Sequence, residues 1–234
     1  KDKAINHLLD IMSASDSKEG DLRQAAEDLR QAAEEGNVDD ATTILDNYPA
    51  VLNETGGEHE NTALIAAAHK GHIPVVEMLL DRDGIAVDVQ NEDGYSAFIL
   101  AASEGHTRIV ELLLQSNCAV DLQSKRGNSA LILAAKRGRT PIVRMLLLHG
   151  ANLDLRTNAA DGEKDALACA REKGHTEIAS LIKKEGCWRR RKAWVMFSSM
   201  YKASLLTATA PLDETVVERA LAMDEITRLI AMWL

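Results

Sequence analysis

One short run of residues recurs along this chain at an almost constant interval. It begins Thr-Ala-Leu-Ile-Ala-Ala-Ala at residue 62 and ends in a glycine and a basic residue. Its copies occupy residues 62–72, 96–106 and 129–139, and their glycines Gly71, Gly105 and Gly138 lie 34 and 33 residues apart. Such a period is typical of stacked supersecondary units that bury their apolar faces against one another. We therefore expect an array of stacked repeats whose function is to bind other molecules, and we do not expect a globular enzyme.

Each copy of the run is followed by a second apolar segment and then by a glycine or asparagine turn. The second segments fall at residues 75–80, 109–114 and 142–148, and they predict the second helix of each unit. Apolar and polar residues then alternate over residues 86–89, 119–122 and 151–155, which is typical of a projecting hairpin. A fourth unit follows at residues 165–182, after an enlarged polar hairpin at residues 158–164.

The N-terminal part predicts a further, degenerate unit. Residues 21–27 are copied without change as residues 28–34, and a seven-residue copy keeps the same helical face because two turns take about 7.2 residues. This helix leads to Gly36, and residues 38–45 form its partner. Before it, the spacing from Ala4 to Met12 predicts a short amphipathic helix, with a polar linker at residues 13–20.

These features resemble the ankyrin repeat family, whose unit carries a Thr-Pro-Leu-His-x-Ala-Ala run, a Gly-His pair, a Leu-rich second helix and a Gly-Ala-Asp end. The resemblance is strong over residues 57–186, which make four repeats, and weak over residues 21–56, a capping repeat. The family's proline is replaced by alanine and its first-helix histidine by isoleucine; these substitutions are Ala63, Ala97, Ala130, Ile65, Ile99 and Ile132. The resemblance implies an all-α solenoid of about five helix-turn-helix repeats with hairpin loops.

The C-terminal extension, residues 187–234, differs in composition, since it holds five of the eight aromatic residues. Residues 188–202 predict a basic, aromatic helix that breaks at residues 207–211, and two shorter amphipathic helices follow. We expect these helices to cap the last repeat, in an arrangement similar to tails on ankyrin proteins of algae. Three alternatives stay open: residues 188–202 contact a membrane surface, they form a basic address signal, or the tail recruits a second protein through exposed Trp233 and Leu234.

The composition and motifs narrow the function. A net charge of −9 argues against general nucleic-acid binding. Three widely spaced cysteines without a CxxC pair favour a reducing compartment, cytoplasmic or nuclear, although an organelle stays open because the chain lacks an initial Met. No run of 18 apolar residues and no catalytic, cofactor or metal motif occurs in the sequence. The histidines His72, His106 and His175 share one position of the repeat, where we expect them to brace the turn within their own unit.

In this architecture the hairpin tips and the exposed side of the first helices form the binding face. One unit places acidic residues there around a tyrosine, and the next places basic residues there, so we expect a charge stripe that orients a protein partner. The alternative is that these charges only keep the face soluble. The predicted partner-binding residues are Glu92, Asp93, Tyr95 and Glu104 in the first unit, and Lys125, Arg126, Asn128, Lys136 and Arg137 in the second. We predict an unidentified protein as the partner, in a larger complex, with no cofactor.

Overall fold

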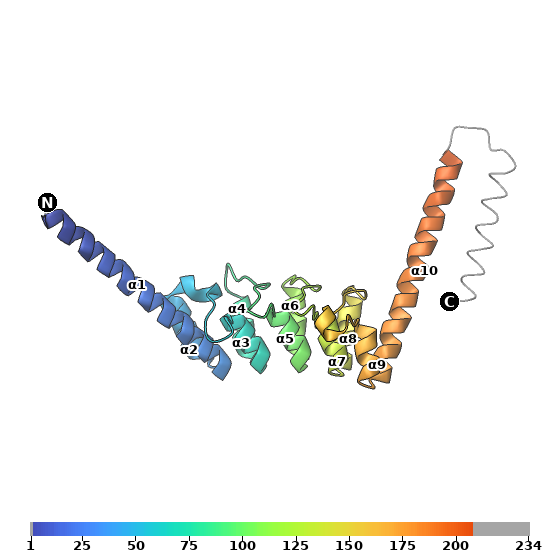
Figure 1. Ribbon diagram of the computed structural model, residues 1–234, viewed down its shortest axis with the longest axis horizontal. Coiled ribbons are helices and arrows are strands. Elements are labelled where there is room, and N and C mark those ends of the chain that lie inside the picture. The colour runs from blue at the N-terminus through green and yellow to red at the C-terminus, as the bar shows by residue number, and fades with distance from the viewer. Residues whose placement is uncertain (1, 208–234) are drawn as a thin grey trace. The chain divides into compact units, whose positions relative to one another are not determined.

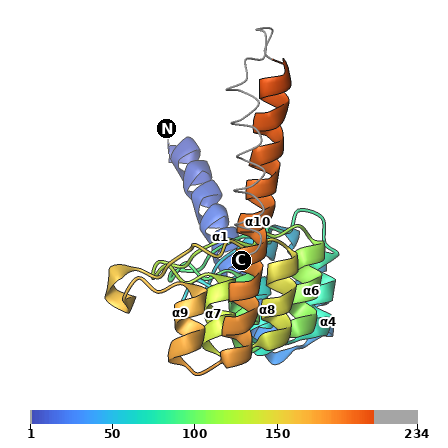
Figure 2. The same cartoon turned by 90° about the vertical axis from the view of Figure 1, so that its right-hand side faces the viewer.

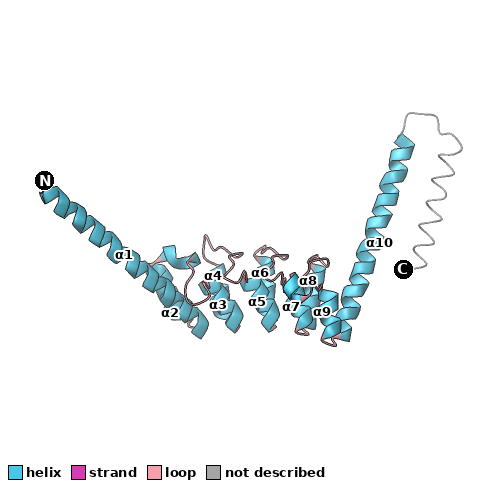
Figure 3. Cartoon of the chain, viewed as in Figure 1, coloured by secondary structure: helices cyan, strands magenta, loops and turns pink. Residues whose placement is uncertain are grey.

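A computed structural model describes the backbone of residues 2–207 and the side chains of residues 19–192. In this part of the chain the regular structure is helical, and strands are reduced to isolated bridges between hairpin residues. Figure 1 and Figure 3 show the helices joined by short loops. The chain divides into two compact units, residues 1–179 and 180–234.

The helices of the first unit come in consecutive pairs, as the repeats predict. The first helices of the pairs are α1 (Asp2–Glu35), α3 (Ala63–Lys70), α5 (Ala97–Glu104), α7 (Ala130–Lys136) and α9 (Ala166–Glu172). The second helices are α2 (Val38–Asn47), α4 (Ile73–Leu80), α6 (Thr107–Gln115) and α8 (Thr140–Leu148), and α10 (Thr176–Thr207) begins in this unit. Short 3-10 helices η1 (Pro49–Asn53) and η2 (Ala159–Asp161) lie in the loops.

Within this unit the helices form two rows. The first helices pack against one another in the order α1, α3, α5, α7, α9, and the second helices pack in the order α2, α4, α6, α8. Figure 2 shows the rows end on, with the hairpin that carries η2 projecting beyond α9. The all-α solenoid predicted from the sequence is confirmed.

The first helices begin and end where their sequence requires. In α5, Ser96 caps the N-terminus by accepting a hydrogen bond from the Ile99 backbone amide at 3.4 Å. The helix ends at Gly105, whose φ of 98° is favourable only for glycine. Between these ends Phe98 and Ile99 are buried, and the alanines beside them let neighbouring helices approach closely.

The histidines of the Gly-His pairs hold neighbouring repeats together, which corrects the prediction that they brace their own unit. His106 Nε2 donates to the carbonyl of His69, in the preceding repeat, at 3.0 Å. The His106 ring lies against Gly71, where a Cβ atom would come within 2.6 Å of Cε1. His72 and His175 bond in the same way to the carbonyls of Glu34 and Lys136.

Two local predictions were wrong. Residues 13–20 form no linker, because α1 runs without a break from Asp2 to Glu35; this segment has no proline, and its serine and charged residues are tolerated in a helix. Residues 188–202 likewise do not form a helix of their own. They are part of α10, which passes through Gly186, as an isolated glycine allows at a cost of about 1 kcal/mol. Residues 208–234, with Trp233, Leu234 and the two short predicted helices, lie outside the described residues.

Candidate protein-binding surface

The hairpin tips are tied to one another by backbone hydrogen bonds. The Glu92 amide donates to the His59 carbonyl at 3.1 Å, and the Lys125 amide donates to the Asp93 carbonyl at 2.9 Å. The next step joins the Asn158 amide to the carbonyl of Arg126 at 2.9 Å. Each tip is therefore held in register with the next, and the side chains there keep a fixed spacing.

Glutamine side chains reinforce this register at the base of the hairpins. Gln90 Nε2 donates to the Gln123 carbonyl, and Gln123 Nε2 donates to the Arg156 carbonyl, both at 3.0 Å. The two glutamines are 33 residues apart and make the same contact one repeat further along. The surface carried by the hairpins is thus built on repeated contacts between repeats.

The structure exposes some of the predicted binding residues and covers others. Tyr95 and Glu104 are half-buried, and Asn128 is only 7% exposed. The exposed residues are Glu92, Asp93, Lys125, Arg126, Lys136 and Arg137. The expectation of an exposed Asn128 was wrong, because this side chain faces the enlarged hairpin, whose Asp161 and Lys164 line the same small cavity.

The charge stripe predicted from the sequence is partly compensated within the protein. Glu104 forms an ion pair with Arg137 of the next repeat. The same carboxylate lies 4.0 Å from His69 Nε2 of the preceding repeat. Glu104 and Arg137 therefore neutralise each other, whereas Lys125, Arg126 and Lys136 form no ion pair with the described side chains.

A small cavity of about 100 Å³ opens where the fourth hairpin meets α7 and α9. We call it the lysine pocket. Its charged and amide side chains are Asn128, Lys136, Asp161, Lys164, Glu172 and Lys173, and Thr157 and Cys169 complete the lining. Lys164 Nζ and Glu172 Oε2 are 2.6 Å apart, and this hydrogen bond raises the pKa of the lysine and lowers that of the glutamate. Both groups are consequently charged at neutral pH.

Four of the six charged and amide residues were missed by the sequence reasoning. Three of them occupy the positions that are equivalent to predicted residues in the preceding repeat. Lys164, Glu172 and Lys173 lie 36 residues after Asn128, Lys136 and Arg137, and 36 residues is the spacing of the last unit. Asp161 has no counterpart at that spacing, because it lies in the enlarged hairpin, on η2. Periodicity alone therefore finds three of the four missed residues, and only the fold shows that η2 brings Asp161 to the same pocket.

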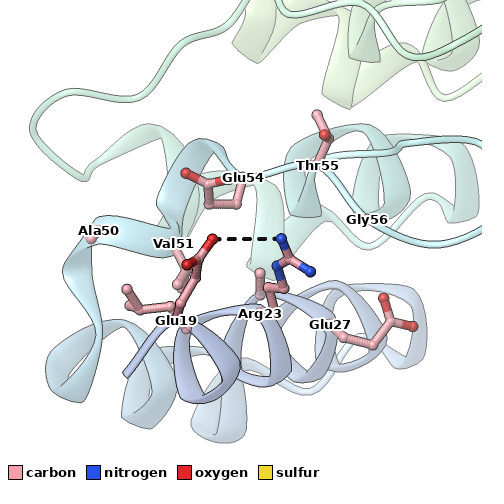
Figure 4. A pocket seen from close by; sticks show the side chains of 10 residues that line it. Glu19, Arg23, Glu27, Ala50, Val51, Glu54, Thr55 and Gly56 are labelled. Carbon is pink, nitrogen blue, oxygen red and sulfur yellow. Dashed lines mark ion pairs between the residues drawn. The ribbon is translucent and has the colours of Figure 1, made fainter. Parts of the chain in front are cut away.

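A larger cavity of about 550 Å³ lies between α1 and the segment that follows η1. Figure 4 shows Glu19 and Arg23 side by side on α1, with 3.5 Å between the paired atoms. Glu27, which also lines this cavity, is ion-paired with Arg30, and that hydrogen bond lowers the pKa of Glu27. The carboxyl group is thus ionised at neutral pH, which does not suit a proton donor.

The thiols and acidic groups of the described residues make no reactive cluster. Burial, and secondarily the charge of Asp88, raises the pKa of Cys118 to about 12, so this thiol stays protonated at neutral pH. Burial also raises the pKa of Cys169. Among the residues that the structure describes, no group of three His, Cys, Asp or Glu side chains is placed to hold a metal ion.

The described part of α10 carries an exposed aromatic side chain among basic ones. Trp188 is 56% exposed, and Lys192 Nζ lies 5.1 Å from the centre of its ring. Lys183, Lys184 and Arg191 line the hollow beside the indole. Within residues 2–207, none of the helices is both long and apolar enough to cross a membrane.

Comparison with known families agrees with this geometry. A family model described as "Ankyrin repeats (3 copies)" matches residues 29–124 and again residues 114–190. The two matches together cover more than half of the chain and run from the end of α1 into α10. Domains of this family generally serve in protein–protein interaction and are typically not catalytic. On this match and on the paired helices stacked with their hairpins in register, the chain belongs to the ankyrin repeat family.

Proposed function

We propose that this chain is a non-enzymatic scaffold that binds a partner protein on the surface formed by its hairpin tips and first helices. The observation that carries the proposal is the hydrogen-bonded register of the hairpins, from His59 and Glu92 to Arg126 and Asn158. A surface whose parts are already fixed loses little conformational entropy when a partner binds. The repeats therefore supply a preorganised docking face.

The charge of this face favours an acidic segment on the partner. Lys125, Arg126 and Lys136 are exposed and lack ion-pair partners among the described residues, whereas Glu104 is already paired. Unpaired charges attract a partner of opposite charge and speed its association at low salt. Glu92 and Asp93 lie one repeat away and discriminate against a partner that is acidic along its whole length.

The experiment is a comparison of proteins captured from native lysate by the wild-type chain and by a variant with Lys125, Arg126 and Lys136 changed to Glu. We expect the variant to lose at least one partner that the wild type retains. A matched variant carries three charge reversals outside this face, at residues Arg82, Arg108 and Arg144, which form surface ion pairs. Equal capture by all three chains, each with an unchanged circular dichroism spectrum, would contradict the proposal.

The three unpaired cysteines support our further proposal that the protein works in a reducing compartment, the cytoplasm or the nucleus. The alternative of an adaptor with a second partner on the C-terminal helices rests on Trp233 and Leu234, outside the described residues.

The exposed Trp188 favours one second candidate function, contact of α10 with an anionic membrane surface. Interfacial helices combine an aromatic anchor with basic residues, and each basic residue near an anionic surface contributes about 1 kcal/mol. Flotation with vesicles of phosphatidylcholine and phosphatidylserine tests this function. Binding that is lost in Trp188→Ala and at high salt would support it, and an absence of flotation would exclude it.

A further inference from the structure

The lysine pocket contains a buried polar group that no described residue of the protein satisfies. Asn128 is 7% exposed and lines this pocket. Its backbone amide donates to Ser124 Oγ, and its carbonyl accepts from the Ser124 amide. Its side-chain amide, by contrast, has no hydrogen-bond partner among the described residues. Buried polar side chains nearly always have a partner, so an unpaired amide facing a cavity indicates that something from outside completes it.

The charges around Asn128 indicate what that group is. Three lysines and two carboxylates define the pocket, so its net charge is +1 at neutral pH. Lys164 and Glu172 form an ion pair at 2.6 Å; Lys173 and Lys136 form no ion pair with Glu172, but their charges also help to lower its pKa, after the larger effect of Lys164. Among the described residues, the pocket donors without an acceptor are thus the ammonium groups of Lys136 and Lys173, the Asn128 amide and the Thr157 hydroxyl, and an anion with two acceptor oxygens matches them.

The size of the pocket narrows the choice further. A volume of about 100 Å³ lies well below the roughly 300–1,000 Å³ of typical small-molecule pockets. This space accommodates the carboxylate end of one side chain and excludes a nucleotide or another large cofactor. The pocket also lies beside the hairpin tips, where the proposed partner docks, because Asn128 follows Lys125 and Arg126 in the same hairpin.

We propose that the lysine pocket receives the carboxylate of one aspartate or glutamate side chain of the partner protein. Asn128 Nδ2 donates one hydrogen bond to it, and Lys136 and Lys173 supply the positive charge. The inference rests on the proposed scaffold function and adds to it a defined anchor. It predicts that the partner carries an acidic residue whose replacement by its amide weakens binding.

The test uses a minimal probe and needs no partner. The capped tripeptides Ac-Gly-Glu-Gly-NH2 and Ac-Gly-Gln-Gly-NH2 are titrated at equal sodium chloride into the ¹⁵N-labelled full chain, and the Asn128 side-chain NH2 signals are followed by NMR. Those signals are assigned by their absence in Asn128→Ala. We expect the glutamate peptide to shift them saturably, with a millimolar dissociation constant, and the glutamine peptide to shift them at least tenfold more weakly.

Three variants separate the anchor from a general charge effect. Asn128→Ala and Lys136→Gln should each weaken the response of other pocket signals to the glutamate peptide severalfold. Arg144→Gln, which removes an exposed cation outside both the pocket and the binding face, should leave that response unchanged. Asn128→Ala should keep its fold, because the lost amide has no partner among the described residues.

Two outcomes overturn the anchor. Equal shifts with both peptides would mean that charge is not recognised, and no shift up to the solubility limit would mean that the amide holds only water. If either occurs while the charge-reversed variant still loses partners from lysate, the scaffold function stands and the anchor alone is refuted.

Discussion

The contact between glycine and histidine across neighbouring repeats predicts a large effect for one small substitution, Gly71→Ala. Gly71 has a φ of 87°, a conformation that costs an L-residue roughly 1–2 kcal/mol. The new Cβ would also lie 2.6 Å from Cε1 of His106. If the ring moves away, it loses its 3.0 Å hydrogen bond to the His69 carbonyl, which contributes about 1 kcal/mol. We expect the free energy of unfolding to fall by about 2–3 kcal/mol, measured by urea denaturation followed by circular dichroism.

Gly174 provides the matched control, since it occupies the same position in the last repeat. Its φ is 76°, but a Cβ there meets no atom within 4 Å. Gly174→Ala should therefore cost only the backbone strain, roughly 1–2 kcal/mol. The double variant Gly71→Ala/His106→Ala should cost less than the sum of its single changes, because removing the ring relieves the clash. Equal losses for Gly71→Ala and Gly174→Ala, or strict additivity in the double variant, would refute this account.

Three further predictions follow from burial and charge. Because burial raises the pKa of Cys118 to about 12, unfolding releases a proton above about pH 9. The free energy of unfolding should therefore fall between about pH 9 and about pH 12, by up to about 1.4 kcal/mol per pH unit. Urea midpoints measured against pH should show this fall in the wild type and not in Cys118→Ala. Changing Leu113, which is 0% exposed on α6, to Ala should lower the free energy of unfolding by about 2–5 kcal/mol. The same change at Leu148, which is 86% exposed, should lower it by less than about 0.5 kcal/mol, as measured by thermal denaturation. Glu104→Gln should destabilise by less than about 1 kcal/mol because its pair with Arg137 is partly exposed, and the effect should shrink in high salt.

The sequence was sufficient to predict the repeats because each structural requirement occurs several times. Ser96 and Ser129 both precede a run of alanines and isoleucine, and both cap a helix in the structure. Gly71 and Gly105 both end a first helix with a positive φ. A requirement that recurs at one period is visible in a single sequence, since chance does not reproduce it at the same spacing.

The candidate site was harder to predict because it depends on differences between repeats. Tyr95 and Asn128 occupy equivalent positions 33 residues apart, yet the first is half-buried and the second is almost fully buried. The difference arises where the enlarged hairpin brings Asp161 and Lys164 beside Asn128. Periodicity cannot place an insertion that breaks the period, so the cavity was not predicted.

Within each repeat, some positions contact the neighbouring repeat, and others are left to contact a partner in the proposed scaffold. Positions that repeat with the same residue are occupied by contacts between units, as Gln90 and Gln123 are with the next hairpin. Even where the histidine is replaced, Arg139 still donates to the Ser103 carbonyl at 3.3 Å, so the contact between repeats is kept by other chemistry. A change at such a position therefore costs stability before it alters binding. In the proposed scaffold, recognition falls to positions that differ between units, such as Asn128, whose buried side-chain amide has no hydrogen-bond partner among the described residues.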